Sequence, residues 1–476
     1  MQKPSSTPEI ELDFDAAAFA RELRAYRNAH PGCEGVEAFV VPIAGSVKGK
    51  WQPMDALEGL AQGAHGAQGA MRMPHSAATI QIWGEDIAGL PLVYEQGDPD
   101  ALCLPVRSRL CPIPWAQRPT AQLLVTPYDP KSGMRSPYAP RNILMNLAER
   151  VAAIGLTPVV ACELEFCLID AERLAETGRP FPPRAIQSGQ LAHSQAYDLA
   201  VSARLAPLFD AIRDACAAQQ LPLKALSCEV APGQIEINLT HVADPLRAAD
   251  QAVLLKRLVA GVAQQQGYAA SFMAKPYADA PGNGFHLHLS LLNAAGENVF
   301  SAQSDAPNAV LSHALAGLLT SLPDFQAVFA PHANSYRRYG AGLLVPLHLA
   351  WGYEHRSVAL RVIDPHGPAA RLEHRVAGAD ANPYLVVAAV LAGLLKGLAE
   401  QSDPGPPIQL SHELARLPRI NRLWATAIKT FEESSLAREA FGAAFHEVFV
   451  AGRREEYERF EQHLTDFEFQ HYLTRV

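Results

Sequence analysis

The alternation of hydrophobic and polar positions divides the chain into two parts that meet near residue 128. In the first part the apolar runs are short, as is typical of a small strand-rich domain. Helical periodicity covers residues 14–29, and the predicted strands are Val36–Ile43, Thr79–Trp83 and Gln122–Thr126. A proline-rich stretch, Leu104–Pro119, separates the last two strands.

In the second part, longer helical patterns alternate with strands, which predicts an α+β domain. The predicted helices are Arg141–Ile154, Tyr197–Gln219, Pro245–Gln266, Ala306–Leu322 and Pro383–Glu400. The predicted strands are Thr157–Ile169, Ile235–Leu239, Gly284–Leu292, Ala359–Ile363 and Arg371–Arg375. The charged segment 431–476 is predicted to form surface helices with a solvated charged face. We therefore expect a flexible tail (1–12), a small domain (13–127) and a larger domain (128–476).

The composition is ordinary for a soluble globular enzyme, with 476 residues of which 49% are hydrophobic and 19% charged. A net charge of −9 argues against nucleic acid as a partner. The N-terminus lacks the basic and apolar regions of a signal peptide, and the longest apolar run, Leu385–Leu395, is too short to span a bilayer. The seven cysteines form no CxxC pair. We expect reduced thiols, a cytoplasmic location and no membrane partner.

Candidate chemistry begins with two carboxylates on one strand. Side chains at i and i+2 lie on the same face of a strand, so Glu163 and Glu165 share a face while Cys162, Leu164 and Phe166 take the other. Neighbouring carboxylates repel unless a positive charge lies between them, and a divalent cation supplies one. An exposed strand face is the alternative, and the apolar flanking sequence argues against it.

Three further segments carry similar groups. His286, His288 and Ser290 share one face of a strand that follows a Gly-rich turn, as a ligand-binding face would, although a single strand histidine is usually structural. Glu229 and Glu236 flank a Pro-Gly turn, a pattern that is also common in ordinary loops. The third segment places Arg371, Glu373 and Arg375 on one face, which indicates either an ion network or a metal ligand between two anion clamps.

Arginine is unusually dense in one apolar stretch. Six arginines lie between residues 337 and 375: Arg337, Arg338, Arg356, Arg361, Arg371 and Arg375. Together with five glutamates and two histidines they indicate a site for a polyanion and divalent metal, such as a nucleoside triphosphate. No GxxxxGK[ST] motif is present, so arginine, histidine and metal would hold the phosphates. The residues alone indicate metal-dependent phosphoryl chemistry and no more.

Eleven short motifs, in this order, resemble the glutamine synthetase family: GSVKGK, YEQGDPD, SPYAPRNIL, ELEF, EVAPGQIE, SFMAKP, GNGFHLHLS, NSYRRY, WGYEHRSVALR, RLEHR and DANPYL. The resemblance implies an N-terminal β-grasp domain and a catalytic domain with a curved antiparallel sheet flanked by helices. It also implies a homo-oligomer, commonly a dodecamer of two hexameric rings, with active sites between subunits. The N-terminal domain of one chain would complete the site of its neighbour.

Position by position, the resemblance implies two Mg²⁺ or Mn²⁺ ions, with ATP as co-substrate. The ligands of one would be Glu165, Glu229 and Glu236, and those of the other Glu163, His286 and Glu373. His288 and Ser290 match nucleotide contacts, and Arg356 and Arg361 match arginines that face the phosphates. Gly282, Arg338 and Arg375 match the glutamate site, and Arg338, Arg356 and Arg375 are the expected catalytic residues. The implied reaction forms γ-glutamyl phosphate, which an amine then attacks.

The chain departs from this pattern where the amine would bind. In glutamine synthetases a glutamate on a flap closes the site and helps to hold ammonium, and Leu344 occupies that position here. An aspartate in a second segment, the latch, helps to deprotonate ammonium, and the corresponding segment Met73–Ser76 has no aspartate. A lysine expected before RLEHR is also missing from Gly367–Ala370. Because ammonium needs compact anionic recognition, these changes predict a larger amine, a polyamine or a monoamine, as in amine catabolism. The expected amine pocket comprises Leu344, His75, Ser76, Asp100 and Tyr197.

Three alternatives stay open. Instead of an amine ligase, the chain could be a glutamine synthetase with an unusual ammonium site or a non-catalytic family member used for binding or structure. The third alternative is a guanidino kinase. Six intact metal-ligand positions disfavour the non-catalytic reading, and the ELEF, NSYRR and ANPYL segments fit ligases better than guanidino kinases.

Overall fold

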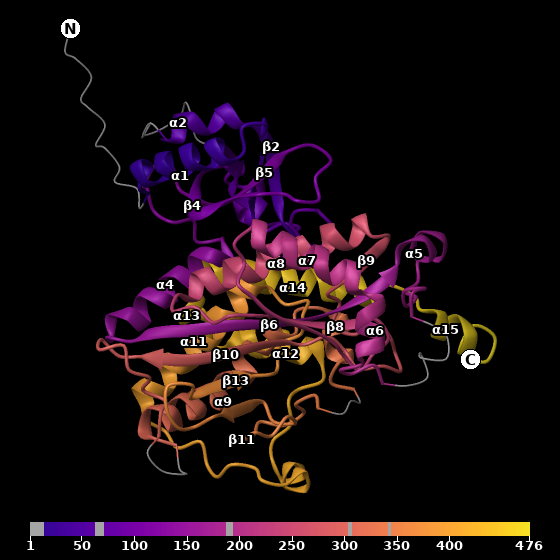
Figure 1. The fold of residues 1–476 in the computed structure, drawn as a ribbon. Helices are drawn as coiled ribbons and strands as arrows, with labels where there is room; N and C mark the ends of the chain where they lie inside the picture. Colours follow the sequence, from indigo (N-terminus) through magenta and orange to yellow (C-terminus); the bar gives the residue numbers. More distant parts are fainter. Residues whose placement is uncertain (1–13, 62–70, 187–193, 303–306, 341–343) are drawn as a thin grey trace.

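The computed structural model describes residues 14–61, 71–186, 194–302, 307–340 and 344–476. The predicted tail, residues 1–12, lies outside the described residues. Figure 1 shows a smaller N-terminal part set above a larger part that contains the long helices and a long central strand. The last strand of the first sheet ends at Tyr128.

The N-terminal part is built on a five-stranded sheet with the order β2-β1-β5-β4-β3. Its strands are β1 (Gly35–Val40), β2 (Lys48–Pro53), β3 (Met71–Pro74), β4 (Asp100–Pro112) and β5 (Thr120–Tyr128). The helical segments are α1 (Ala16–Ala29), η1 (Met54–Leu57), α2 (Glu58–Ala61), η2 (His75–Ala78) and α3 (Pro91–Tyr94). Strands β1 and β5 pair in parallel, and the other neighbours pair antiparallel.

Two predictions for this part are wrong. Thr79–Trp83 is no strand, because the backbone N–H of Thr79 already bonds the carbonyl of Ser76 in the 3₁₀ turn that precedes it. The proline-rich stretch supplies much of β4 instead. Pro105 is tolerated there because the pairing with β5 shifts register between Pro105 and Leu110, where a missing N–H costs little.

The larger part is built on an eight-stranded sheet with the order β11-β12-β13-β10-β6-β8-β7, and β9 pairs with the far end of β6. Its strands are β6 (Thr157–Asp170), β7 (Leu223–Cys228), β8 (Gln234–Leu239), β9 (Tyr268–Ser271), β10 (Phe285–Leu292), β11 (Trp351–Tyr353), β12 (Leu360–Ile363) and β13 (Arg371–His374). All neighbours pair antiparallel except β11 and β12.

The helices of this part are α4 (Pro140–Ala153), α5 (Ala171–Thr177), α6 (Leu199–Arg204), α7 (Ala206–Ala218), α8 (Pro245–Gln265), α9 (Ala309–Phe329), α10 (Ala333–Arg337), α11 (Pro383–Glu400), η4 (Ser411–Arg416), α12 (Trp424–Glu433), α13 (Ser435–Phe441), α14 (Ala443–Glu461) and α15 (Asp466–His471). The helix predicted over Tyr197–Gln219 is two helices that meet at Leu205, because Pro207 in the first turn of α7 has no N–H to continue α6.

The sequence predicts only solvated surface helices for the C-terminal segment, and this prediction is wrong for α14. Helix α14 buries Phe445, Phe449 and Arg453, and the Arg453 guanidinium is compensated by Glu456 at 2.6 Å. Among the helices of this C-terminal segment, only α15, at the edge of the molecule in Figure 1, has no buried residue. The error arises because charged residues on α14 lie between the buried ones and mask the apolar stripe in a short window.

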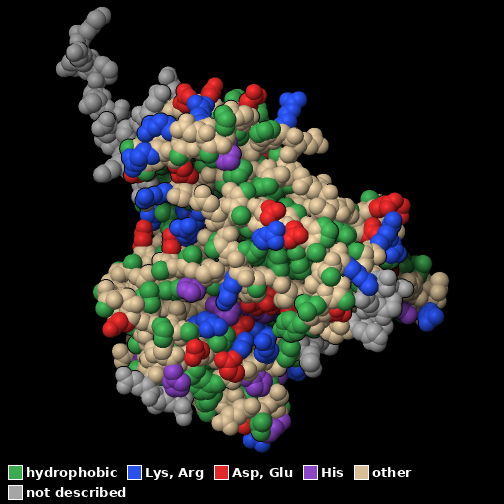
Figure 2. Space-filling model, viewed as in Figure 1, with side chains coloured by type: hydrophobic (Ala, Val, Ile, Leu, Met, Phe, Trp, Pro, Cys, Tyr) green, Lys and Arg blue, Asp and Glu red, His purple; other side chains and the backbone are tan. Residues whose placement is uncertain are grey.

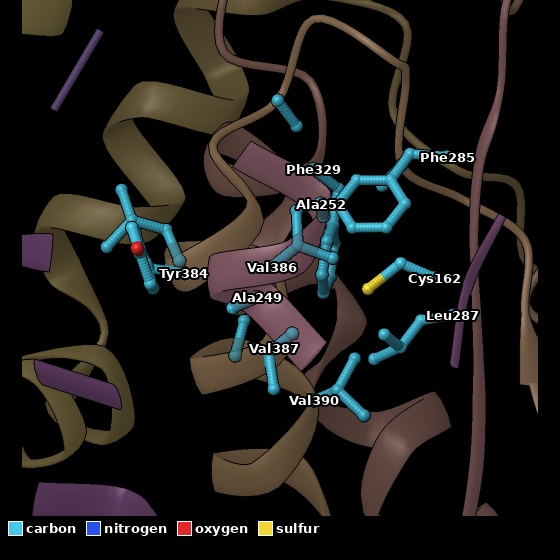
Figure 3. Packing of buried hydrophobic residues seen from close by; sticks show 14 of the residues in the cluster. Cys162, Ala249, Ala252, Phe285, Leu287, Phe329, Tyr384, Val386, Val387 and Val390 are labelled. Atoms are coloured by element: carbon cyan, nitrogen blue, oxygen red, sulfur yellow. The ribbon is translucent and has the colours of Figure 1, made fainter. Parts of the chain in front are cut away.

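The core lies on the face of the sheet that Cys162, Phe285 and Leu287 share, and it packs against α8 and α11 (Figure 3). Helix α11 is the only helix among the described residues long and apolar enough to span a membrane, and most of it is buried. The strand alternation that buries one face leaves the other face for polar residues. Figure 2 shows acidic, basic and histidine side chains gathered near the middle of the larger part.

Candidate active site

Strand register brings the predicted charged residues into rows on the polar face of the large sheet. His286 on β10 lies opposite Glu163 on β6, and Glu165 lies opposite Glu236 on β8. One step further along the strands, Glu373 on β13 lies opposite both His288 and Arg361. Residues that are up to 210 positions apart in the sequence therefore form one continuous surface.

Glu163 lies at the centre of this surface. One oxygen of its carboxylate is 2.7 Å from Nδ1 of His286, and the other is 3.5 Å from Nε2 of His288. Burial opposes ionisation of Glu163, but the hydrogen bonds with these histidines outweigh it and keep its pKa well below the usual value. Ligand atoms of Glu163, His288 and Glu373 all lie within 4.8 Å of one another, a suitable grouping for a metal ion. His288 stands in this grouping where the sequence predicted His286, whose Nδ1 lies 2.7 Å from Glu163 and 3.6 Å from Glu373.

Glu373 is held between cations. Arg361 donates to one carboxylate oxygen at 3.1 Å, and Arg375 donates to the other. Burial again opposes ionisation, but His286 and Arg375 outweigh it and lower the pKa of Glu373. The carboxylate is therefore ionised at neutral pH and can bind a metal cation.

A second group of carboxylates is crowded together. Glu165 accepts from the backbone N–H of Gly284 at 2.7 Å, which fixes its orientation. Burial raises the pKa of Glu229 to about 7, and the charge of Glu165 adds to the shift. Burial raises the pKa of Glu236 to about 8, and the charge of Glu163 adds to that shift. Such crowding costs stability unless a cation neutralises it, so this donor set fits a hard divalent metal.

This crowding predicts a pH-dependent stabilisation by metal. Because folding raises the two pKa values above the ordinary 4.5, the metal-free protein loses stability as the pH rises from about 5 through 8. The melting temperature in EDTA should fall across that window, and Mg²⁺ or Mn²⁺ should remove most of the fall. Glu236→Gln should flatten the EDTA curve. A gap between the EDTA and Mg²⁺ curves that is constant from pH 5 to 8 would contradict this account.

The polar face forms a cavity of about 680 Å³. Among the predicted residues, the following line it: Glu163, Glu236, His288, Ser290, Arg356, Arg361, Glu373 and Tyr197. Along β10 the cavity face changes from His286 and His288 through Ser290 to Leu292, a span of about 20 Å. Strand β12, which β13 separates from β10, changes in the same direction, from Arg361 to Ile363. The cavity therefore has a charged end and an apolar end, as a nucleotide requires.

Two predicted glutamate-site arginines lie beside this cavity and are partly engaged by the protein itself. Arg338 is buried and donates to the carbonyl of Val376 at 2.8 Å, and Arg375 donates to the carbonyl of Arg356 at 3.0 Å. Gly282 packs tightly beneath them, since a β-carbon there would lie 2.2 Å from the carbonyl oxygen of Ala274. These contacts hold both arginines in place, with Arg375 next to Glu373.

The predicted amine-pocket residues are not brought together within one chain. Tyr197 lines the cavity, and Leu344 is exposed with a positive φ of 71°. His75 and Ser76 belong to the N-terminal part, where His75 lies 2.8 Å from the hydroxyl of Ser136 and Ser76 donates to Asp98 at 2.6 Å. Asp100 begins β4 there as well. None of the three N-terminal residues lines the cavity of its own chain.

Three polar residues that the sequence did not assign to this site also line the cavity, Lys224, Asn238 and His241, and so does Arg371 from the predicted set of arginines. Arg371 shares a strand face with Glu373, so the spacing already contained the signal. Lys224 carried none, because it lies at a register shift between Leu223 and Ala225 in β7, where regular alternation breaks down. It adds a cation to a cavity that lacks the lysine expected before β13.

Comparison with known proteins identifies the family of the chain. The family model for the glutamine synthetase catalytic domain matches residues 137–472. The chain is 36% identical over 458 residues to the γ-glutamylputrescine synthetase of Escherichia coli, covering 95% of this chain and 94% of the relative. It is 33% identical to a glutamate–isopropylamine ligase of a Pseudomonas species, covering 82% and 86%.

A further relative is the γ-glutamylethanolamide synthetase of Streptomyces coelicolor, 34% identical over 71% of this chain and 72% of the relative. Among solved structures, a GmaS–ADP complex matches with a TM-score of 0.79 and 26% identity, covering 96% of this chain and 99% of that one. The predicted α+β class with a glutamine synthetase-type catalytic domain is confirmed. The chain belongs to the glutamine synthetase family.

Proposed function

We propose that this protein is an ATP-dependent ligase that joins the γ-carboxylate of glutamate to an organic amine. The observation that carries the proposal is the graded polar face, which runs from carboxylates, histidines and arginines to an apolar end in a family of such ligases. The relatives reported above are named for putrescine, isopropylamine and ethanolamine, and all three are organic amines.

In this proposal two clusters of side chains each bind one divalent ion, Mg²⁺ or Mn²⁺. Glu165, Glu229 and Glu236 would hold one, and Glu163, His286 and Glu373 the other. The bound metal supplies charge neutralisation for the phosphoryl group. Arg356 and Arg361 would bind the phosphates of ATP, His288 and Ser290 the rest of the nucleotide, and Gly282, Arg338 and Arg375 the glutamate.

The proposed reaction has two steps. A γ-carboxylate oxygen of glutamate attacks the γ-phosphorus of ATP, and the bond to ADP breaks. The amine nitrogen then attacks the acyl carbon, phosphate leaves, and the amine gives up one proton. Arginines aimed at the transferred phosphoryl group stabilise charge that develops between the two bonds. Arg375 in the proposed glutamate site is buried and reorganises little as this charge develops.

The amine site supports an organic substrate more than ammonium. Leu344 replaces the flap carboxylate of true glutamine synthetases, and His75 and Ser76 lie where the latch aspartate is expected. A leucine offers an ammonium ion no anionic partner, whereas it can pack on the carbon chain of an amine. We infer that the pocket, with Asp100 and Tyr197, accepts a polyamine or a monoamine.

The direct test is the mass of the product. Purified protein is incubated with glutamate, ATP, Mg²⁺ and one amine at a time, and the mixture is analysed by mass spectrometry. The proposal predicts a γ-glutamyl amide and one phosphate per amide formed, with no product when any component is left out. Phosphate release without amide, with every amine offered, would contradict it.

We further propose that the protein forms a ring oligomer, a dodecamer of two hexamers, in which His75, Ser76 and Asp100 complete the site of a neighbouring chain. The C-terminal residues support assembly. Exposed apolar side chains cluster there: Leu464, Phe467, Phe469, Tyr472 and Leu473. A monomer would leave this patch in water, so another copy of the chain is the expected partner. The seven buried, unpaired cysteines suit a reducing cytoplasm.

Removing residues 463–476 should therefore lower the assembly mass. We expect light scattering to show a smaller oligomer for this truncation, while far-UV circular dichroism stays close to that of the intact protein because α15 buries nothing within its own chain. Arg475→Ala is the control and should assemble normally. An unchanged mass after truncation would show that these residues are not an assembly contact.

A further inference from the structure

A second cavity, of about 590 Å³, lies where the five-stranded sheet meets the helices of the larger part. Its walls come from α1, β4, β5, α4 and α8, and it includes no residue of the proposed active site. We propose that this junction cavity binds a small organic acid, whose anionic groups would be held by four arginines. The inference does not depend on the proposed ligase function.

The centre of the junction cavity is a buried ion cluster with more cations than anions. Asp250 accepts from Arg109 at 3.2 Å and from Arg141 at 2.9 Å, and its side chain is 2% exposed. The hydroxyl of Tyr384 also donates to Asp250, at 2.8 Å. Two guanidinium groups thus share one carboxylate that is already saturated with donors. Arg109 also donates to the carbonyl of Ser108 at 2.8 Å, and Arg141 donates a second time to Asp250 at 3.2 Å. The N–H groups that these bonds leave over can take a further acceptor.

Two more arginines stand at the rim. Arg107 and Arg247 line the junction cavity, are exposed, and make no side-chain hydrogen bond or ion pair with any described residue. Arg107 lies in the irregular stretch of β4 between Pro105 and Leu110, where Ser108 has a positive φ of 57°. A break of this kind re-aims side chains that regular pairing would direct elsewhere.

The other carboxylates of the cavity are already occupied by main-chain donors. Asp15 accepts from Ala18 at the start of α1, and Asp244 accepts from Leu246 and Arg247 at the start of α8. Glu22 accepts from the N–H groups of Ser108 and Leu110 at 2.8 and 3.0 Å. Formal charges balance at four arginines and four acids, but the N–H donors of four guanidinium groups outnumber the acceptor sites of four carboxylates, so donors make up most of the remaining hydrogen-bonding capacity. A ligand that supplies acceptors, a carboxylate above all, is the complement.

Part of the wall is apolar, which narrows the ligand class. The apolar lining residues are Phe14, Phe19, Val106, Met145 and Leu246. A bare phosphate ion would leave this part of the cavity unfilled. A carboxylate on a short carbon chain satisfies both kinds of wall, and two carboxylates would reach both the buried cluster and the rim. Such a ligand would tie α1 and β4 to α4 and α8.

The test is calorimetric titration of the full-length protein with succinate, acetate and inorganic phosphate. A paired variant, Arg107→Ala with Arg247→Ala, removes the rim donors and leaves the buried cluster intact. Its matched control, Arg21→Ala with Arg118→Ala, removes the same charge from exposed arginines that do not line the cavity. We expect saturable succinate binding that the paired variant weakens by about tenfold and the control leaves unchanged.

Both variants change residues outside the proposed active site. A failure of the succinate test and a failure of the proposed ligase function can therefore be told apart. Succinate binding that survives the paired variant would place the ligand elsewhere and overturn the proposal. Absence of saturable binding for all three probes would also overturn it. Phosphate binding without preference for succinate would mean an adventitious ion only, which equally contradicts an organic-acid site.

Discussion

Replacing Glu163 by Gln is expected to lower kcat by at least about 100-fold while the protein stays folded. The side chain keeps its size but loses the charge that faces His286 and His288 at 2.7 and 3.5 Å. In the proposed site it also loses a metal ligand that no neighbour replaces. Phosphate release at saturating ATP, glutamate and amine measures the effect, and a higher Mn²⁺ concentration should restore part of it.

Glu439→Gln is the matched control, because Glu439 is exposed on α13 and pairs only with Arg150 at the surface. It should retain full activity. If Glu163→Gln kept more than about a tenth of wild-type kcat at low Mg²⁺, Glu163 would not be a metal ligand. A large drop in melting temperature would instead indicate a structural role for the carboxylate.

Replacing Leu344 by Glu is expected to shift preference towards ammonium. The substitution restores an anion at the proposed flap position, which favours a small hydrated cation and disfavours an alkyl chain. We expect the ratio of kcat/KM for ammonium to that for the best organic amine to rise by about 100-fold, about 2.7 kcal/mol of discrimination. Initial rates of phosphate release with each amine give this ratio.

Leu344→Gln separates charge from shape, since it is nearly isosteric with the glutamate and neutral. It should leave the ratio within about threefold of wild type if the charge is what matters. Equal shifts in the two variants would mean that loss of the leucine alone causes the change. No shift in either would remove Leu344 from the amine pocket.

Much of the sheet and its polar face followed from two-residue periodicity. Glu163 and Glu165 face the cavity side, while Leu164 between them and Phe166 after them are fully buried, as alternation predicts. The helices over 141–154 and 245–266 were also predicted within two residues of their observed ends. These elements are long and strongly patterned, so local sequence decides them.

The failures lie where long-range contacts decide. Thr79–Trp83 has strand composition, yet Gln81 there donates to the carbonyl of Gly452 on α14, a contact 371 residues away in sequence. The same contact helps bury α14, which short windows predict to be solvated. Lys224 joins the cavity only through an irregular pairing of β7 with β8. No local pattern contains such information.

In the proposed reaction an organic amine, not ammonium, is the substrate. The most direct measurement is kcat/KM for ammonium, putrescine, spermidine, ethanolamine, isopropylamine and an aromatic monoamine, followed by phosphate release with glutamate, ATP and Mg²⁺. The account predicts one organic amine to exceed ammonium by at least about 100-fold, the contribution of a lost anionic partner. Ammonium as the best substrate would contradict it and make the protein a glutamine synthetase.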